Sequence, residues 1–290
     1  MQLGTTTVPH TCSSKEELET LNKIISKAEA GDTIGQFLLA MRYEEGRGVP
    51  QDYARALELY KQSADQDNEI AMLYVGKYYE YGWGVEPDRK EAAKWYLIGA
   101  ENGHDTSQIY LAYCYLEGEE DQRDIQKAIY WFDQAAQQGN EKAMGRLGDI
   151  YFFGEGIDKD EQQGIRYYIR AAEHGNLRTQ SLIANIYYFG YGCEVNYDEA
   201  YKWACKSAAG GHLRGREMLS MMYMSGNGVE KDDVIAHALY FSILEEGKLR
   251  NLGTSLTKTF LTPEEFYQAR MLCSVILCEP YEVINIIQSV

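Results

Sequence analysis

Three basic residues at equivalent positions of a repetitive chain are the clearest candidates for chemistry. They are Lys142, Arg178 and Arg214, each 36 residues from the next. Because they share a register, we expect them to line up on neighbouring helices, about 10 Å apart. Such a row could hold an acidic segment or a C-terminal carboxylate of a partner. The alternative is that each cation pairs inside the chain, with an acidic neighbour such as Glu173 or Glu217.

Large apolar side chains fill two further registers near the ends of the same helices. The first register holds Tyr81, Phe153 and Phe189, and the second holds Leu116, Phe152, Tyr188 and Met224, with Tyr113 and Met221 beside them. If exposed, these residues would form the floor of a groove for a protein or peptide. If they pack between helices, they are only core, and both interpretations stay open. The candidate partner-binding residues beside the basic row are Lys77, Tyr81, Tyr113, Phe153, Tyr188 and Phe189.

No pattern of nucleophiles, histidines or carboxylates predicts catalysis. The sequence lacks a phosphate-binding glycine loop, an H-E-x-x-H motif and a Ser/His/Asp or Cys/His arrangement at a telling spacing. Its six cysteines form no C-x-x-C pair and do not recur with the repeat, so neither a zinc site nor a disulfide ladder is indicated. We therefore expect a protein that is not an enzyme and that needs no cofactor and no metal.

The elements that would position these side chains recur every 36 residues. The period is marked by a glycine that ends a helix, at Gly46, Gly82, Gly118, Gly154, Gly190 and Gly226. A capping residue then starts a second helix, at Asp52, Asp88, Asp124, Asp160, Asn196 and Asp232. Capping is a sufficient explanation of this carboxylate series. A strict period of this length predicts an all-α solenoid of helix–turn–helix repeats.

The period also predicts the organisation of the chain. We expect a flexible N-terminus over 1–13, a capping helix over 14–31 and C-terminal capping helices over 248–290. Within the last segment, Thr262 and Pro263 predict a helix over 263–278, and a short helix is expected near 281–289. Six repeats lie between, at 32–67, 68–103, 104–139, 140–175, 176–211 and 212–247.

The consensus of these repeats, A-x-x-x-L-G-x-x-Y-x-x-G-x-G-V-x-x-D-x-x-K/E-A-x-x-W-Y-x-x-A-A-x-x-G, resembles the Sel-one-like repeat (SLR) family, relatives of the tetratricopeptide repeats. In the fourth repeat the matching residues include Ala143, Leu147, Gly148, Tyr151, Gly154, Gly156, Asp160, Ala171, Ala172 and Gly175. The resemblance covers about 32–247. It implies a right-handed superhelix of paired antiparallel helices whose first helices line a concave surface, and an adaptor rather than an enzyme. The third repeat departs from the consensus, because it reads GEEDQRD where the others have the glycine turn.

The charge of the chain limits its partners. A formal net charge of -16 and a pI near 4.8 disfavour general nucleic-acid binding, since the phosphate backbone would be repelled. Because the sequence shows neither a secretory signal nor an apolar span, we expect a cytoplasmic protein that does not insert into a membrane. The function we predict is a non-catalytic adaptor that binds a protein or peptide. The alternative is an inhibitor or immunity protein whose acidic surface neutralises a cationic toxin or enzyme.

Overall fold

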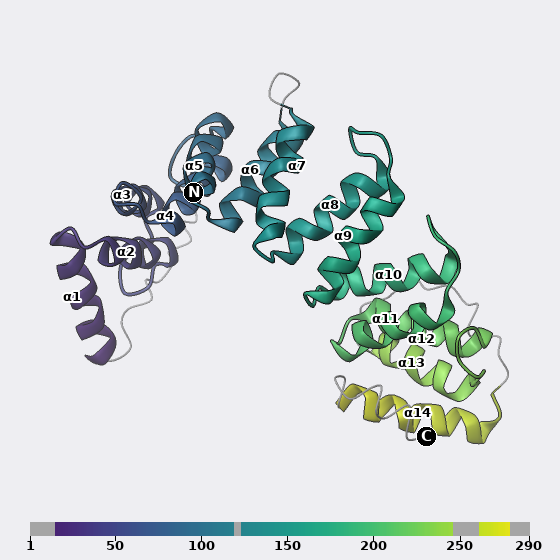
Figure 1. Cartoon of the computed structure of the whole chain (residues 1–290). Helices are drawn as coiled ribbons and strands as arrows, with labels where there is room; N and C mark the ends of the chain where they lie inside the picture. The colour runs from purple at the N-terminus through teal and green to yellow at the C-terminus, as the bar shows by residue number, and fades with distance from the viewer. Residues whose placement is uncertain (1–14, 119–122, 246–260, 279–290) are drawn as a thin grey trace, which may run out of the picture. The chain divides into compact units, whose positions relative to one another are not determined.

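The computed structural model describes residues 15–118, 123–245 and 261–278, and these ranges contain helices but no β-strand. The predicted all-α fold of helix–turn–helix repeats is therefore confirmed (Figure 1). The helices are α1 (Lys15–Glu29), α2 (Thr33–Glu45), α3 (Tyr53–Ala64), α4 (Glu69–Tyr81), α5 (Arg89–Glu101), α6 (Asp105–Glu117), α7 (Ile125–Gln137), α8 (Glu141–Phe153), α9 (Glu161–Glu173), α10 (Leu177–Phe189), α11 (Tyr197–Ala209), α12 (Leu213–Ser225), α13 (Asp233–Glu245) and α14 (Pro263–Cys278).

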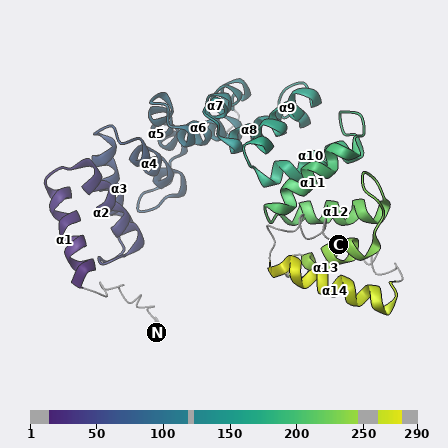
Figure 2. The same cartoon turned by 60° about the horizontal axis from the view of Figure 1, so that its bottom comes forward.

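The chain divides into two compact units, Met1–Gln138 and Gly139–Val290, here called unit 1 and unit 2. Unit 1 holds α1 to α7 and unit 2 holds α8 to α14. From α2 to α13 the helices alternate between a first helix of each repeat, the A helix, and a second, the B helix. Within each unit, every A helix packs against the B helix that follows it (Figures 1 and 2).

The B helices begin where the capping series predicts. The side chain of Asp52 accepts a hydrogen bond from the backbone N–H of Arg55 at 2.9 Å, which satisfies one of the donors that a helix start leaves unpaired. The equivalent bond recurs at the other predicted caps: Asp88, Asp124, Asp160, Asn196 and Asp232. The carboxylate series is thus explained by helix capping.

The glycine turns depend on a backbone conformation that other residues adopt at a cost. Gly46, the residue that ends α2, has a φ of 67°, and its N–H bonds to the carbonyl of Arg42. The third repeat differs here, because Gly118 has a φ of -56° and lies outside the left-handed region. This departure coincides with the sequence GEEDQRD, of which residues 119–122 lie outside the described ranges.

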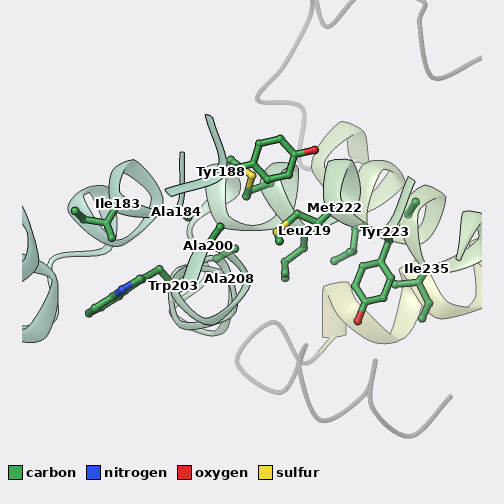
Figure 3. Close-up of a cluster of buried hydrophobic side chains, with 14 of the residues drawn as sticks. Ile183, Ala184, Tyr188, Ala200, Trp203, Ala208, Leu219, Met222, Tyr223 and Ile235 are labelled. Atoms are coloured by element: carbon green, nitrogen blue, oxygen red, sulfur yellow. The ribbon is translucent and has the colours of Figure 1, made fainter. Parts of the chain in front are cut away.

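In the second and fourth repeats an aromatic ring of the B helix packs closely on a glycine of the A helix. A Cβ added to Gly76 would overlap the ring of Tyr96, and one added to Gly148 would overlap the ring of Tyr168. Small residues at these positions therefore set the close approach of the two helices. Apolar side chains from successive helices complete the core, as Figure 3 shows for Ile183, Leu219, Met222 and Ile235 in unit 2.

At the C-terminal end, α14 spans Pro263–Cys278, the bounds predicted from the Thr262-Pro263 start, and it packs against α13. The hydroxyl and N–H of Thr262 both donate to Glu265, which closes a capping box at the start of this helix. The predicted N-terminal segment 1–13 and the short helix near 281–289 lie outside the described residues.

Candidate functional site

One stripe of each A helix carries all the candidate binding residues except Tyr188. It consists of the residues at positions i, i+4, i+7 and i+11, which lie on one helix face because eleven residues make about three turns. We call it the A stripe. The stripes discussed below are Ile70, Tyr74, Lys77 and Tyr81 on α4, Lys142, Arg146, Asp149 and Phe153 on α8, and Arg178, Leu182, Asn185 and Phe189 on α10.

The basic row opens the A stripes of unit 2, and all three side chains are exposed. Arg214 lies 3.1 Å from Glu217, the internal partner that the sequence offered for it. Arg178 lies 3.8 Å from Asp149 of the preceding A helix, and not beside Glu173. Lys142 has no ion pair among the described residues. Because the Arg178 and Arg214 side chains are 71% and 65% exposed, both guanidinium groups remain accessible to another molecule.

A charge network lies beside Arg178, the middle member of the row. Arg146 donates two hydrogen bonds to the carboxylate of Glu155, at 3.1 and 2.6 Å, and so ties the A stripe of α8 to the glycine turn. Asp149 lies 3.6 Å from Arg146 and 3.8 Å from Arg178, and it accepts a hydrogen bond from the hydroxyl of Tyr168 at 2.7 Å. No sequence pattern predicted this network, because it joins three helices at positions where the repeats differ.

The two apolar registers differ in exposure. The first register is exposed: Tyr81 by 52%, Phe153 by 61% and Phe189 by 47%. In the second register Leu116 and Tyr188 are buried, whereas Phe152 and Met224 are half-buried. The hydroxyl of Tyr188 is bonded to Ser225 and accepts from the Asn227 amide at 3.0 Å. Tyr188 is therefore a core residue and offers no surface to a partner.

In unit 1, the ring of Tyr81 stacks on Trp83 of the glycine turn, with centroids 5.0 Å apart. Trp83 also stacks on Tyr53, at 6.4 Å. Tyr113 is half-buried and packs edge-on against Phe132 at 5.2 Å. It lines a cleft of about 800 Å³ whose walls include the basic residues Arg89, Lys90, Lys94, Arg123 and Lys127.

Lys77 lies between two tyrosine rings of unit 1. Its ammonium nitrogen is 5.5 Å from the ring centre of Tyr74 on its own helix and 4.9 Å from that of Tyr110 on α6. These are cation–π contacts. Lys77 was a candidate binding residue from the sequence, but the sequence did not reveal the two rings.

Thiols and metal-ligating side chains are the remaining candidates for chemistry among the described residues. Burial raises the pKa of the Cys114 thiol to about 12 and that of Cys205 to about 11, so both stay protonated at neutral pH. In the same ranges, no three His, Cys, Asp or Glu side chains gather as a metal site would require. Nor is any described helix both long and apolar enough to pass through a bilayer.

Two buried polar features were missed by the sequence analysis. The hydroxyls of Tyr60 and Tyr96 each donate to a glutamate of the A helix, Glu44 and Glu80, at 2.6 Å. Burial raises the pKa of both hydroxyls, and the glutamate contacts raise it further. Arg216 is fully buried in α12 and donates to the hydroxyl of Ser242 at 3.2 Å. A signal for the first pair existed, because glutamate and tyrosine recur together in the first two repeats.

The repeat geometry agrees with a family model described as Sel1 repeat, which matches residues 33–68, 70–104, 106–140, 141–176, 179–212 and 215–247. The chain belongs to the Sel1 repeat family. The resemblance to Sel-one-like repeats is thereby confirmed. The sequence has no match among curated proteins.

Two solved Sel1 repeat structures are similar to this chain. One is c5321, a protective antigen present in uropathogenic Escherichia coli strains, with a TM-score of 0.74 and 30% identity. That match covers 94% of this chain, which spans only 59% of the length of c5321. The other is a Sel1 repeat protein from Oxalobacter formigenes, with a TM-score of 0.64, 26% identity and coverage of 79% of this chain and 99% of that one.

Proposed function

We propose that this Sel1 repeat protein is a non-catalytic adaptor that binds a protein or peptide along its A stripes. In unit 2, Lys142, Arg178 and Arg214 would anchor acidic groups, and Phe153 and Phe189 would take apolar side chains. In unit 1, the corresponding surface is formed by Lys77, Tyr81 and Tyr113. The family supports this proposal in a general way, since Sel1 repeats are typical of protein-interaction scaffolds.

The observation that carries the proposal is the pairing of charge and ring on single helices. On α8, exposed Lys142 and exposed Phe153 stand eleven residues apart on one stripe, and Arg178 and Phe189 repeat this on α10. With a rise of 1.5 Å per residue, the backbone positions of the two residues in each pair lie about 16 Å apart along the helix. An extended segment of about five residues spans that distance, so one peptide could use both ends.

The internal ion pairs of the row do not argue against this role. Arg214 and Glu217 form an exposed pair, and such pairs contribute about 0 to 1 kcal/mol. Arg178 approaches Asp149 only at 3.8 Å, longer than a hydrogen bond. A carboxylate from a partner could therefore replace or add to either contact at small cost.

The test is selection of binders from a displayed library of random peptides. We expect the wild-type protein to select peptides that combine acidic and apolar residues. The triple variant K142E/R178E/R214E should bind them at least about tenfold more weakly while keeping its helicity. The control K159E/K202E/K231E changes the charge equally at exposed lysines outside the A stripes of unit 2. Equal binding by both triple variants would refute the role of the basic row.

The second candidate function is an inhibitor or immunity protein that covers a cationic toxin or enzyme. It is supported by the net charge of -16. In that case the library would yield basic peptides, and the triple reversal of the basic row would not weaken their binding. Association would also slow steeply with ionic strength, because long-range charge would steer the encounter.

A further inference from the structure

We propose that Lys77 is the binding point for a carboxylate side chain of the bound peptide, with the rings of Tyr74 and Tyr110 as its walls. This inference rests on the proposed function, because it requires a peptide on the A stripes of unit 1. It adds the chemical class of the group that is recognised there.

The two tyrosine rings beside Lys77 are held in place by other aromatic rings of unit 1. Tyr74 stacks on Tyr60, with ring centres 4.9 Å apart, and meets Phe37 edge-on at 5.7 Å. Tyr110 packs on Tyr96 at 5.2 Å. Both walls are therefore held by core rings, and the ammonium group of Lys77 lies within 5.5 Å of each wall.

The charge of Lys77 lacks a counter-ion in the part of the chain that the structure describes. Lys77 is only half-exposed, and no carboxylate of these residues forms an ion pair with it. The closest acid along its own helix, Glu80, accepts instead from the hydroxyl of Tyr96 at 2.6 Å. Contact with two ring faces offsets part of the lost hydration, but it satisfies none of the three N–H donors.

The equivalent position of unit 2 holds a charged side chain that has both counter-ions and a hydrogen-bond partner. Asp149 lies 72 residues after Lys77 and occupies the same position within its repeat. It has two arginines within 3.8 Å and a tyrosine hydroxyl at 2.7 Å. Lys77 has no such set among the described residues. A partner carboxylate would supply the acceptor and the opposite charge together.

A carboxylate fits this position better than a phosphate group does. Lys77 is a single cation in a strongly acidic protein. A carboxylate carries one negative charge, which one ammonium group balances, whereas a phosphate monoester carries close to two at neutral pH. The exposed side chains at the two ends of the same stripe, Ile70 and Tyr81, would contact apolar neighbours of the acidic residue.

The experiment uses peptides selected from the random library by the wild-type protein. Each Glu or Asp is changed in turn to Gln or Asn, and binding is measured to wild type, to Lys77→Met and to the control Lys23→Met. Lys23 is an exposed lysine of unit 1 on α1, outside the A stripes. We expect one acidic position whose amide weakens binding to wild type and to Lys23→Met by about tenfold, but to Lys77→Met by less than about twofold.

If every acidic position loses the same affinity toward wild type and Lys77→Met, the inference is wrong while the proposed function stands. If wild type selects no peptide, both are wrong. Should Lys77→Met lose helicity, the measurement moves to the side-chain NMR signals of Lys77 in the wild-type protein. These should shift with the acidic peptide and not with its amide, and equal shifts would overturn the inference.

Discussion

The hydroxyl of Tyr168 donates a hydrogen bond of 2.7 Å to Asp149, and this contact joins the core of α9 to the A stripe of α8. Both side chains are buried. The other carboxylate oxygen of Asp149 faces Arg146 and Arg178 at 3.6 and 3.8 Å. The candidate binding residue Arg178 thus rests on a carboxylate that is itself held by the core of the repeat.

Replacing Tyr168 with phenylalanine should lower the free energy of unfolding by about 1 to 2 kcal/mol. The ring and its packing stay, but a buried carboxylate loses a hydrogen-bond donor. Urea unfolding followed by circular dichroism measures the change. Tyr191→Phe is the matched control in the same unit, because Tyr191 is exposed, and it should change stability by less than about 0.5 kcal/mol. Equal effects of the two changes would show that the Tyr168 hydroxyl does not stabilise the fold.

Gly148→Ala should destabilise the protein by about 1 to 3 kcal/mol, because the added methyl would overlap the ring of Tyr168. Gly145, on the same helix, provides the control. A Cβ there would meet only the methyl group of Thr179, at an ordinary 3.5 Å. Gly145→Ala should therefore stabilise α8 by about 0.5 to 1 kcal/mol, since alanine is the better helix former. Thermal unfolding of the two variants should give shifts of opposite sign, and a loss from both would contradict this account.

Much of the fold could be predicted from the sequence because local chemistry repeats with the period. The glycines that end the A helices and the Asp or Asn residues that start the B helices act within a few residues of their own position. Their roles at Gly46 and Asp52 hold wherever the period repeats them. Gly118 is the exception, and its repeat is the one that lacks the second glycine of the turn.

The candidate site was less predictable, because exposure depends on contacts between repeats. Tyr188 and Phe189 are adjacent aromatic residues, yet the first is buried and bonded to Ser225 while the second faces outward. The partner of Arg178 is Asp149, a residue of the preceding repeat. Neither fact follows from a pattern within one repeat. The basic row could be found in the sequence, because its three residues are spaced by one repeat period.

Asp67→Gly should stabilise unit 1 by about 0.5 to 1 kcal/mol. Asp67 has a φ of 62°, in a register that glycine occupies in the other repeats. This left-handed conformation strains a residue with a side chain, although Asp tolerates it better than most. The control is Asp65→Gly, because Asp65 has an ordinary φ of -63° and should lose stability through added chain entropy. Urea midpoints that fall for both variants would show that Asp67 is not strained.

His212 is the N-cap of α12 but makes no capping hydrogen bond, so His212→Asn should stabilise unit 2 by about 1 kcal/mol. The same register holds Asn140 and Asn176, whose side chains accept hydrogen bonds from the N–H groups of the first turn. His212 makes no such bond, and its buried Nδ1 has no hydrogen-bond partner among the described residues. His104→Asn is the control, because the His104 Nδ1 already accepts from the N–H of Ser107 at 3.3 Å. This control should change stability by less than about 0.5 kcal/mol.

The gain in the free energy of unfolding from His212→Asn should increase as the pH is lowered. Burial lowers the pKa of His212, and the charge of Arg214 lowers it further. The unfolded chain, with an imidazole pKa of about 6.5, therefore binds a proton more readily than the folded protein does. Above about pH 6.5 His212 is neutral in both states and does not lower the free energy of unfolding. As the pH falls below this value, protonation of His212 in the unfolded chain lowers the free energy of unfolding. Urea midpoints of wild type and His212→Asn should thus separate further as the pH is lowered, and a constant separation would show that His212 does not titrate with folding.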